Sequence, residues 1–264
     1  MTQDTTGSTS AHTEGGETAR RAFRLLEAVA SQLGPCTPSE LAAMTGLSLS
    51  TTYRLVRILN EEQYVQRGPD GYRVGPRLFS LAAAAMPQLA AFDAVRPLMS
   101  ELAARTGETV ALHRRLGDSG VVIGTQESAQ HELRRVSRVG TTSLLARNPA
   151  GHAILAGLPE HDRSAVVTRT VPPQQREAVL GELTEAARRG WAFAEESNQP
   201  GVRGLAQELP LPPDPTNAMA LSVTGPSQRV TMPVAEKIAP LLADIGTQIA
   251  QVIRRVRGDG EADG

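Results

Sequence analysis

At 264 residues, of which 40% are hydrophobic, the chain is long enough for two domains, or for one large domain with a sizeable core. No run of about 18 apolar residues occurs, and the polar N-terminus lacks the apolar segment of a signal peptide, so we expect a cytoplasmic protein with no membrane span. A formal net charge of −1 excludes a strongly basic protein that coats nucleic acid without sequence preference. The one cysteine, Cys36, excludes an internal disulfide and a thiolate-rich metal site.

Residues 1–17 are polar and poor in apolar side chains, so we expect them to be disordered. Within residues 19–31 the apolar residues have helical spacing, which predicts an amphipathic helix. Its apolar positions are Ala22, Leu25, Leu26 and Val29. Phe23 lies outside this set and is expected to add to a contact between subunits.

Residues 37–74 have the pattern of a helix, a tight turn, a second helix and a two-stranded wing. Thr37 stands at the N-cap position of the first helix, with Pro38 at the first helical position. Glu40 follows three residues after the cap, which is the spacing of a capping box. Gly46 supplies the positive φ that ends this helix and turns the chain.

The second helix has two chemically different faces, and a serine hydroxyl from either Ser48 or Ser50 caps it. One face is expected to pack on the core. That face holds Thr52, Leu55, Val56 and Leu59. The opposite face carries hydroxyl and guanidinium groups, which suit phosphate oxygens and guanine edges in a major groove.

The wing is predicted from residues 68–71, a turn between two short strands with Asp-Gly as the hairpin signal. Arginines flank the turn and are placed to reach backbone phosphates. The candidate DNA-binding residues are therefore Ser48, Ser50, Thr51, Tyr53, Arg54, Arg57, Arg67 and Arg73. Residues 18–80 contain eight arginines against five acidic residues, a local surplus that suits a specific DNA reader. Helix-turn-helix shapes also occur in helical proteins that never contact DNA, and the wing, arginines and capping box together favour DNA binding.

After this DNA-binding domain, residues 18–78, we expect a helical linker at residues 79–92. The alanine-rich stretch that starts it is a strong helix former, and Pro87 predicts a kink or break near Met86. The alternative is that this stretch is the last helix of the first domain.

Residues 93–257 are predicted to form a second domain of mixed antiparallel α+β structure, followed by a disordered tail at 258–264. Asp93 is expected to cap its first helix, which ends at Gly107. The further expected strands are 108–116, 121–126, 131–139, 191–194, 201–209 and 218–224, and the further expected helices are 143–155, 172–189 and 234–255.

Several motifs resemble the IclR (isocitrate lyase regulator) family of transcription factors. In the first domain these are residues 46–55 and 71–78. In the second domain they are residues 106–110, 139–156, 189–192, 200–206 and 220–226, which resemble the family's GAF-like effector-binding domain. The resemblance covers residues 18–256, and the chain departs from the family pattern at Leu49, Tyr53, Ala146, His152 and Ser197.

The resemblance implies a ligand-responsive transcriptional regulator, a repressor or an activator, that binds a palindromic double-stranded DNA operator as a homodimer or tetramer. It also implies a small-molecule effector pocket. The candidate ligand-binding residues are Gly140, Leu145, Ala146, Arg147, Asn148, Gly201 and Ser222. An arginine with an amide neighbour favours an anionic ligand such as a carboxylate. The alternative is that Arg147 pairs with a surface acid.

The sequence has no H-E-x-x-H motif, no G-x-S-x-G elbow and no glycine-rich phosphate loop, and its histidines are scattered. We therefore expect no enzyme, cofactor or metal site. Two alternatives stay open: an enzyme with an appended DNA-binding domain, and a DNA-binding dimer that senses no ligand.

Overall fold

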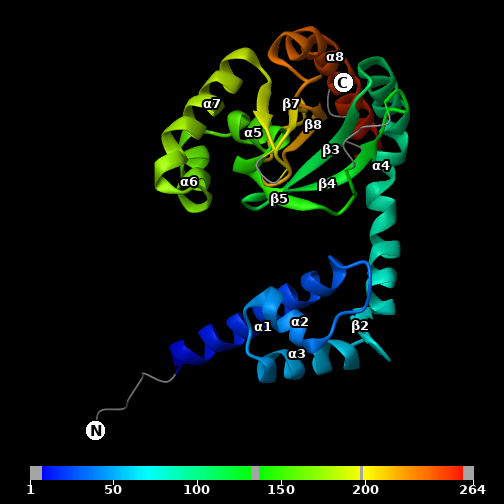
Figure 1. Ribbon diagram of the computed structural model, residues 1–264, viewed down its shortest axis with the longest axis vertical. Coiled ribbons are helices and arrows are strands. Elements are labelled where there is room, and N and C mark those ends of the chain that lie inside the picture. Colours follow the sequence, from blue (N-terminus) through cyan, green and yellow to red (C-terminus); the bar gives the residue numbers. More distant parts are fainter. Residues whose placement is uncertain (1–7, 132–136, 197–198, 258–264) are drawn as a thin grey trace, which may run out of the picture. The chain divides into compact units, whose positions relative to one another are not determined.

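The computed structural model describes residues 8–131, 137–196 and 199–257 (Figure 1). Its internal contacts divide the chain into two compact units, Met1–Gln88 and Leu89–Gly264. The division lies within the segment 79–92 that was expected to link two domains.

The first unit is a small helical domain with a two-stranded hairpin. Its described elements are α1 (Ser8–Ala30), α2 (Pro38–Thr45), α3 (Leu49–Glu61), β1 (Val65–Gly68) and β2 (Gly71–Val74). Leu25 of α1, Leu41 of α2 and Leu55 of α3 are fully buried and meet in one core. Because α1 begins at Ser8, part of the segment 1–17 that we expected to be disordered is helical.

A single long helix, α4, runs from Pro76 to Thr106. The predicted break near Met86 is wrong, and Asp93 lies inside the helix rather than at its start. One proline removes one backbone hydrogen bond and need not end a helix whose flanking residues strongly favour helix, as the alanines before it do. The Asp93 carboxylate accepts a hydrogen bond from Arg96 within the same helix.

The second unit contains a six-stranded antiparallel sheet in the order β5-β4-β3-β8-β7-β6. The strands are β3 (Thr109–Leu116), β4 (Ser119–Gln126), β5 (Thr142–Leu144), β6 (Ala192–Glu195), β7 (Val202–Glu208) and β8 (Met219–Pro226). The helices are η1 (Leu145–Arg147), α5 (Pro149–Gly157), α6 (Glu160–Thr170), η2 (Pro173–Gln175), α7 (Arg176–Arg189) and α8 (Met232–Arg257). The predicted α+β class is confirmed.

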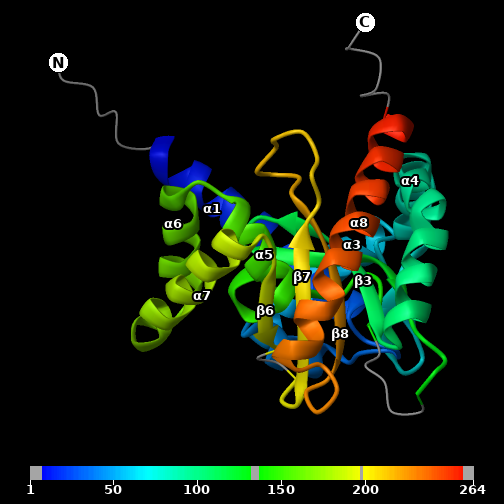
Figure 2. The ribbon, with the colours of Figure 1, turned by 90° about the horizontal axis from the view of Figure 1, so that it is seen from above.

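Each face of this sheet is covered by helices, and each has its own core (Figure 2). The C-terminal part of α4 and helix α8 pack on one face, against large apolar residues such as Leu112, Leu205 and Leu221. Helices α5, α6 and α7 pack beside the other face, where the strands carry small residues such as Ala206 and Ala220. Small side chains on that face leave room for helices and for polar groups.

Some predicted elements of the second unit differ from the structure. Residues 143–155 are not one helix: they end strand β5, form η1, and enter α5 only at Pro149. The predicted helix 172–189 starts as α7 at Arg176 after the short turn η2, and α6 was not predicted. The expected strand 131–139 lies largely outside the described residues, and residues 137–139 are not strand.

Candidate DNA-binding and ligand-binding sites

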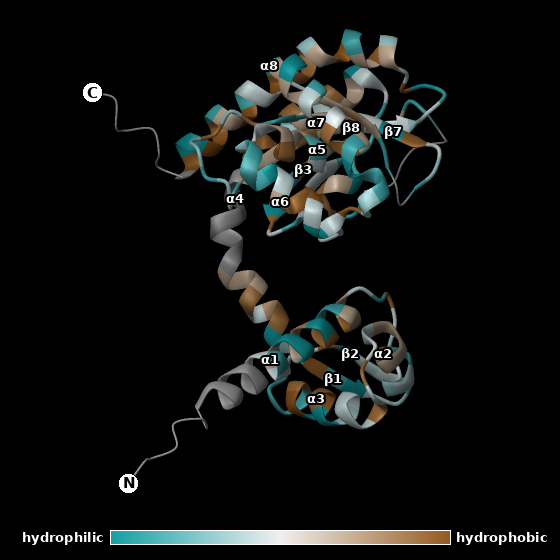
Figure 3. Ribbon diagram, turned by 90° about the vertical axis from the view of Figure 1, so that its left-hand side faces the viewer, coloured by the Kyte–Doolittle hydropathy of each residue, from teal (hydrophilic) through white to brown (hydrophobic). Residues whose placement is uncertain are grey.

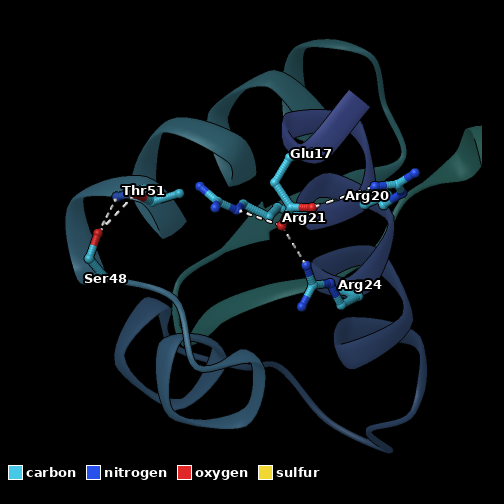
Figure 4. Close-up of polar contacts among 6 residues, drawn as sticks. All are labelled: Glu17, Arg20, Arg21, Arg24, Ser48 and Thr51. Atoms are coloured by element: carbon cyan, nitrogen blue, oxygen red, sulfur yellow. Dashed lines mark hydrogen bonds and ion pairs between the residues drawn. The ribbon is translucent and has the colours of Figure 1, made fainter. Parts of the chain in front are cut away.

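The start of α3 is held by a cluster of hydroxyl groups. Ser48 is the N-cap: its Oγ accepts a hydrogen bond from the backbone N–H of Thr51 at 3.3 Å and donates to Thr51 Oγ1 at 2.9 Å (Figure 4). Ser50 Oγ lies 3.2 Å from Ser48 Oγ. All three lie at the helix N-terminus, where backbone N–H groups and the helix dipole favour an anion such as a phosphate.

The two faces of α3 separate as predicted, and hydrophobic and hydrophilic positions are visible along its ribbon (Figure 3). The apolar face is buried and consists of Thr52, Leu55, Val56 and Leu59. Tyr53 is 54% exposed, and Arg54 and Arg57 are also exposed. Arg57 forms only a weak surface pair with Glu61, 3.5 Å between Nε and Oε1.

The wing is fixed to the rest of the unit beside its turn. Strands β1 and β2 pair from Val65–Val74 to Gly68–Gly71, and Tyr72 exchanges two 2.8 Å backbone hydrogen bonds with Cys36. Gly71 has φ +136°, and a Cβ there would lie 2.5 Å from the carbonyl oxygen of Cys36. Only glycine allows this close approach, so the position of the wing depends on it.

Helix α3 and the wing line one hollow of about 620 Å³. The predicted DNA-binding residues that line it are Tyr53, Arg54, Arg57 and Arg67. Arg73 lies outside the lining, because it pairs with Gln66 and so faces the opposite side of the hairpin from Arg67. The acid Asp70 also lines the hollow, at the tip of the wing.

Arginines on α1 are arranged differently from those on α3. Glu17 accepts hydrogen bonds from Arg21 at 3.1 Å and Arg24 at 3.0 Å, and Arg20 lies 3.8 Å away (Figure 4). The hydrogen bond from Arg21 lowers the pKa of Glu17. The positive charge of α1 is therefore partly balanced within the helix.

In the second unit, polar side chains gather on the sheet face beside α5. Strand residues alternate between faces, so Ser222 and Thr224 lie opposite Leu221 and Val223, which are in the core against α4 and α8. Ser222 Oγ lies 3.0 Å from His113 Nε2. Thr224 is 2% exposed, and its buried hydroxyl has no hydrogen-bond partner among the described residues.

A second hollow of about 460 Å³ lies between η1, α5, α7 and the edge strand β6. Ala146 and Arg147 line it, as does His152. Asn148 does not: its side chain caps α5, accepting from Gly151 N–H at 2.8 Å and donating to Ser143 Oγ at 2.7 Å. The hydrogen bonds of the Asn148 side-chain amide therefore hold the segment around η1 against the start of α5.

The remaining predicted ligand residues are placed apart from one another. Leu145 is fully buried in the core of η1, α5, α6 and α7. Gly140 and Gly201 are exposed and have positive φ values of 88° and 83°, which suits tight turns. The sequence contained no local signal that His113, Thr224 or Glu182 belongs to a site. Pairing of distant strands brings His113 and Thr224 to the polar sheet face, and helix α7 brings Glu182 to the hollow beside η1.

Two family models cover most of the chain: the IclR helix-turn-helix domain matches residues 18–69, and the bacterial transcriptional regulator IclR C-terminal domain matches residues 83–251. The chain belongs to the IclR family of bacterial transcriptional regulators. It is a transcriptional regulator with a DNA-binding helix-turn-helix domain and an effector-binding domain. No helix in the described ranges is both long and apolar enough to cross a membrane.

Relatives of known type agree with this assignment. The HTH-type transcriptional regulator Rv1719 of Mycobacterium tuberculosis is 31% identical over 238 residues, covering 84% of this chain and 87% of the relative. An IclR-type regulator from Silicibacter sp. TM1040 matches in structure with a TM-score of 0.74 and 25% identity, covering 89% of this chain and 96% of the other. The fold is also that of an IclR homolog from Microbacterium hydrocarbonoxydans complexed with 4-hydroxybenzoate, with a TM-score of 0.69, 23% identity and coverage of 90% and 99%.

Proposed function

We propose that this IclR-family regulator binds a palindromic operator as a homodimer or a dimer of dimers, and that a small-molecule effector on its second unit changes its DNA affinity. The observation that supports the DNA-binding part best is the exposed row Tyr53, Arg54 and Arg57 on α3, opposite the buried face of the same helix. As a DNA-binding regulator it would act in the cytoplasm, where the bacterial chromosome lies.

In this proposal α3 enters the major groove, with Arg54 and Arg57 reading base edges or phosphates. The hydroxyl groups at the start of α3 lie where a backbone phosphate is favoured. Arg67 and Arg73, on opposite sides of the hairpin, would contact phosphates on the two sides of the wing.

Pairing of two copies is supported by large apolar side chains exposed on the first unit. Phe23 on α1 is 64% exposed, and Phe79 at the start of α4 is 67% exposed. Water contact with such rings is unfavourable, and their burial in a subunit interface removes it. A dimer also doubles the base contacts, which a single small domain needs for specific binding.

The effector part is supported by the polar sheet face of the second unit. Within the described ranges the buried hydroxyl of Thr224 has no hydrogen-bond partner, and such a group is costly unless a ligand or water satisfies it. Thr224 pairs across the sheet with Gly204, and Gly204 with Ala194, which lines the hollow beside Arg147. At about 5 Å per strand, the two features are roughly 10 Å apart, within the reach of one small ligand. This arrangement favours a ligand-binding domain over one that senses no ligand.

An effector that binds one conformation of the second unit better than another would shift the balance between two DNA affinities. The regulator bound to 4-hydroxybenzoate suggests an aromatic carboxylate as a first compound to test. Such a ligand would place its carboxylate on Arg147.

The test is selection of bound duplexes from a random-sequence pool by the full-length protein, followed by footprinting. We expect a palindrome whose half-sites are about 34 Å, or a multiple of this, apart on one side of the DNA. Enrichment of sequences without two-fold symmetry, or no enrichment at all, would contradict the proposed mode of binding.

A further inference from the structure

The hollow of about 460 Å³ beside η1 is lined by ionisable side chains from four different elements. These are Arg147 of η1, His152 of α5, Glu182 of α7 and Glu195 of β6. Small-molecule sites in proteins commonly have volumes of roughly 300–1,000 Å³. The size therefore suits a metabolite, and the charges on its walls indicate what kind.

The protonation state of His152 follows from its contacts. Its Nε2 lies 3.2 Å from the carbonyl oxygen of Ala146, and because a carbonyl only accepts hydrogen bonds, Nε2 carries the proton. The side chain is buried, and this burial lowers the pKa of His152 below its usual value. The ring is thus neutral at pH 7, and Nδ1 presents a lone pair.

That lone pair faces a carboxylate. Glu182 Oε2 lies 3.5 Å from His152 Nδ1, so two hydrogen-bond acceptors converge with no proton between them. A donor that reaches both atoms would satisfy the pair, and an ammonium group offers three N–H donors and the opposite charge. The side chain of Glu182 is 55% exposed, so a ligand can reach it from solvent.

The other carboxylate in the hollow is already engaged. Glu195 accepts a hydrogen bond from the backbone N–H of Gly201 at 3.0 Å and one from Arg203 at 3.5 Å. Its negative charge is therefore balanced within the protein. Glu182 instead lies 3.5 Å from a neutral ring, that of His152, which makes it the stronger site for a cation.

We propose that the hollow binds a small zwitterion, with the ligand's ammonium group on Glu182 and His152 Nδ1 and its carboxylate on Arg147. The guanidinium has five N–H donors in a planar fork, so it can bind a carboxylate alongside its contacts within the protein. His152 contacts both sides of the hollow, since its Nε2 lies 3.2 Å from the carbonyl oxygen of Ala146, next to Arg147, and its Nδ1 lies 3.5 Å from Glu182 Oε2. The inference rests on the effector-binding role proposed above and adds the chemical class of the ligand.

Three related probes separate the contributions of the two charges: 4-(aminomethyl)benzoate, 4-methylbenzoate, which lacks the ammonium, and benzylamine, which lacks the carboxylate. Isothermal titration of the full-length protein at pH 7.5 should give an affinity for the zwitterion at least about tenfold above that for either other probe. Glu182→Gln should remove this advantage and leave 4-methylbenzoate binding unchanged. Arg147→Gln should weaken both carboxylates and leave benzylamine unchanged.

The matched control is Glu177→Gln, an exposed carboxylate on the same helix α7 that does not line the hollow. It should bind all three probes as the wild type does, and thermal melts should confirm that every variant is folded. Absent binding of the zwitterion, equal affinity for the zwitterion and 4-methylbenzoate, or an unchanged Glu182→Gln variant would each overturn the proposal. Operator binding is measured separately, so equal binding of the carboxylates with retained operator binding would reject the zwitterion and leave the regulator role intact.

Discussion

Glu108 and Arg229 form a two-pronged ion pair that joins the start of β3 to the segment between β8 and α8. Arg229 donates from Nε to Oε1 at 2.6 Å and from Nη2 to Oε2 at 2.9 Å. Only 5% of the Glu108 side chain is exposed, and its carboxylate packs so closely on Gly225 that a Cβ there would lie 2.1 Å from Oε2. The pair holds two segments that are distant in the sequence at one end of the sheet.

We expect Arg229→Met to destabilise the second unit by about 3 kcal/mol, because it leaves a buried carboxylate without its cation. Chemical denaturation followed by tryptophan fluorescence measures this, since Trp191 is the protein's one tryptophan and belongs to this unit. Arg169→Met is the control: its pair with Asp118 is as well aligned but more exposed, and its loss should cost about 1 kcal/mol or less. Equal losses in the two variants would show that burial of Glu108 does not set the cost.

Arg54→Ala should weaken binding to the selected operator by about 1–3 kcal/mol and reduce discrimination between operator and random DNA. The side chain is exposed on α3, so its removal should leave the melting temperature unchanged. Fluorescence anisotropy at two salt concentrations measures affinity and charge dependence together. Arg105→Ala removes an exposed arginine from the second unit and should have no effect on either quantity. Wild-type affinity of the Arg54 variant would argue against α3 as the recognition helix.

Gly71→Ala should weaken DNA binding by displacing the wing. The added Cβ would lie 2.5 Å from the Cys36 carbonyl oxygen, at a φ of +136° that alanine rarely adopts. We expect the first unit to lose at least about 1 kcal/mol of stability. Operator affinity should fall by a larger free energy than this. Gly34→Ala is the control, because a Cβ at that position meets nothing within 4 Å.

Glu208 should make the protein less stable at high pH. Burial against the end of α5 raises the pKa of Glu208 to about 7, and a Cβ on Gly157 would lie only 1.6 Å from its Oε2. The Glu208 carboxyl ionises near pH 4.5 in the unfolded chain but near pH 7 in the folded protein. The unfolded state therefore binds fewer protons than the folded state between these two pH values. The free energy of unfolding should then fall as pH rises through this window and stay low above it.

Glu208→Gln removes this penalty and should stabilise the protein at pH 8 by about 1–2 kcal/mol, with little effect at pH 4.5. This figure is discounted from the full pKa shift because solvent reaches part of the side chain. Urea denaturation at a series of pH values measures the difference. A stability gap that does not change with pH would mean that the carboxyl group is not responsible.

Local signals in the sequence predicted the helix-turn-helix and the wing of the first unit. The capping box of Thr37 and Glu40, the stop at Gly46 and the two faces of α3 depend on residues within one or two helical turns of each other, and all are confirmed. The hairpin is also local, since its turn sets its register. Of the two serines that could cap α3, the structure selects Ser48.

The second unit shows where such reasoning stops. Its strand order places β8 between β3 and β7, so Ser222 meets His113, 109 residues earlier. The hydroxyl of Thr224 is buried and has no hydrogen-bond partner in the part of the chain that the structure describes. The division of residues 143–155 into strand, turn and helix likewise follows from pairing with β4 and from the Asn148 cap, not from helix propensity.

In the first unit, the spacing of residues along the chain determined which side chains of α3 point away from the core, because helical geometry repeats every few residues. Which polar groups meet in the second unit was decided only when distant strands paired, since sheet pairing and the burial of charge are properties of the folded chain.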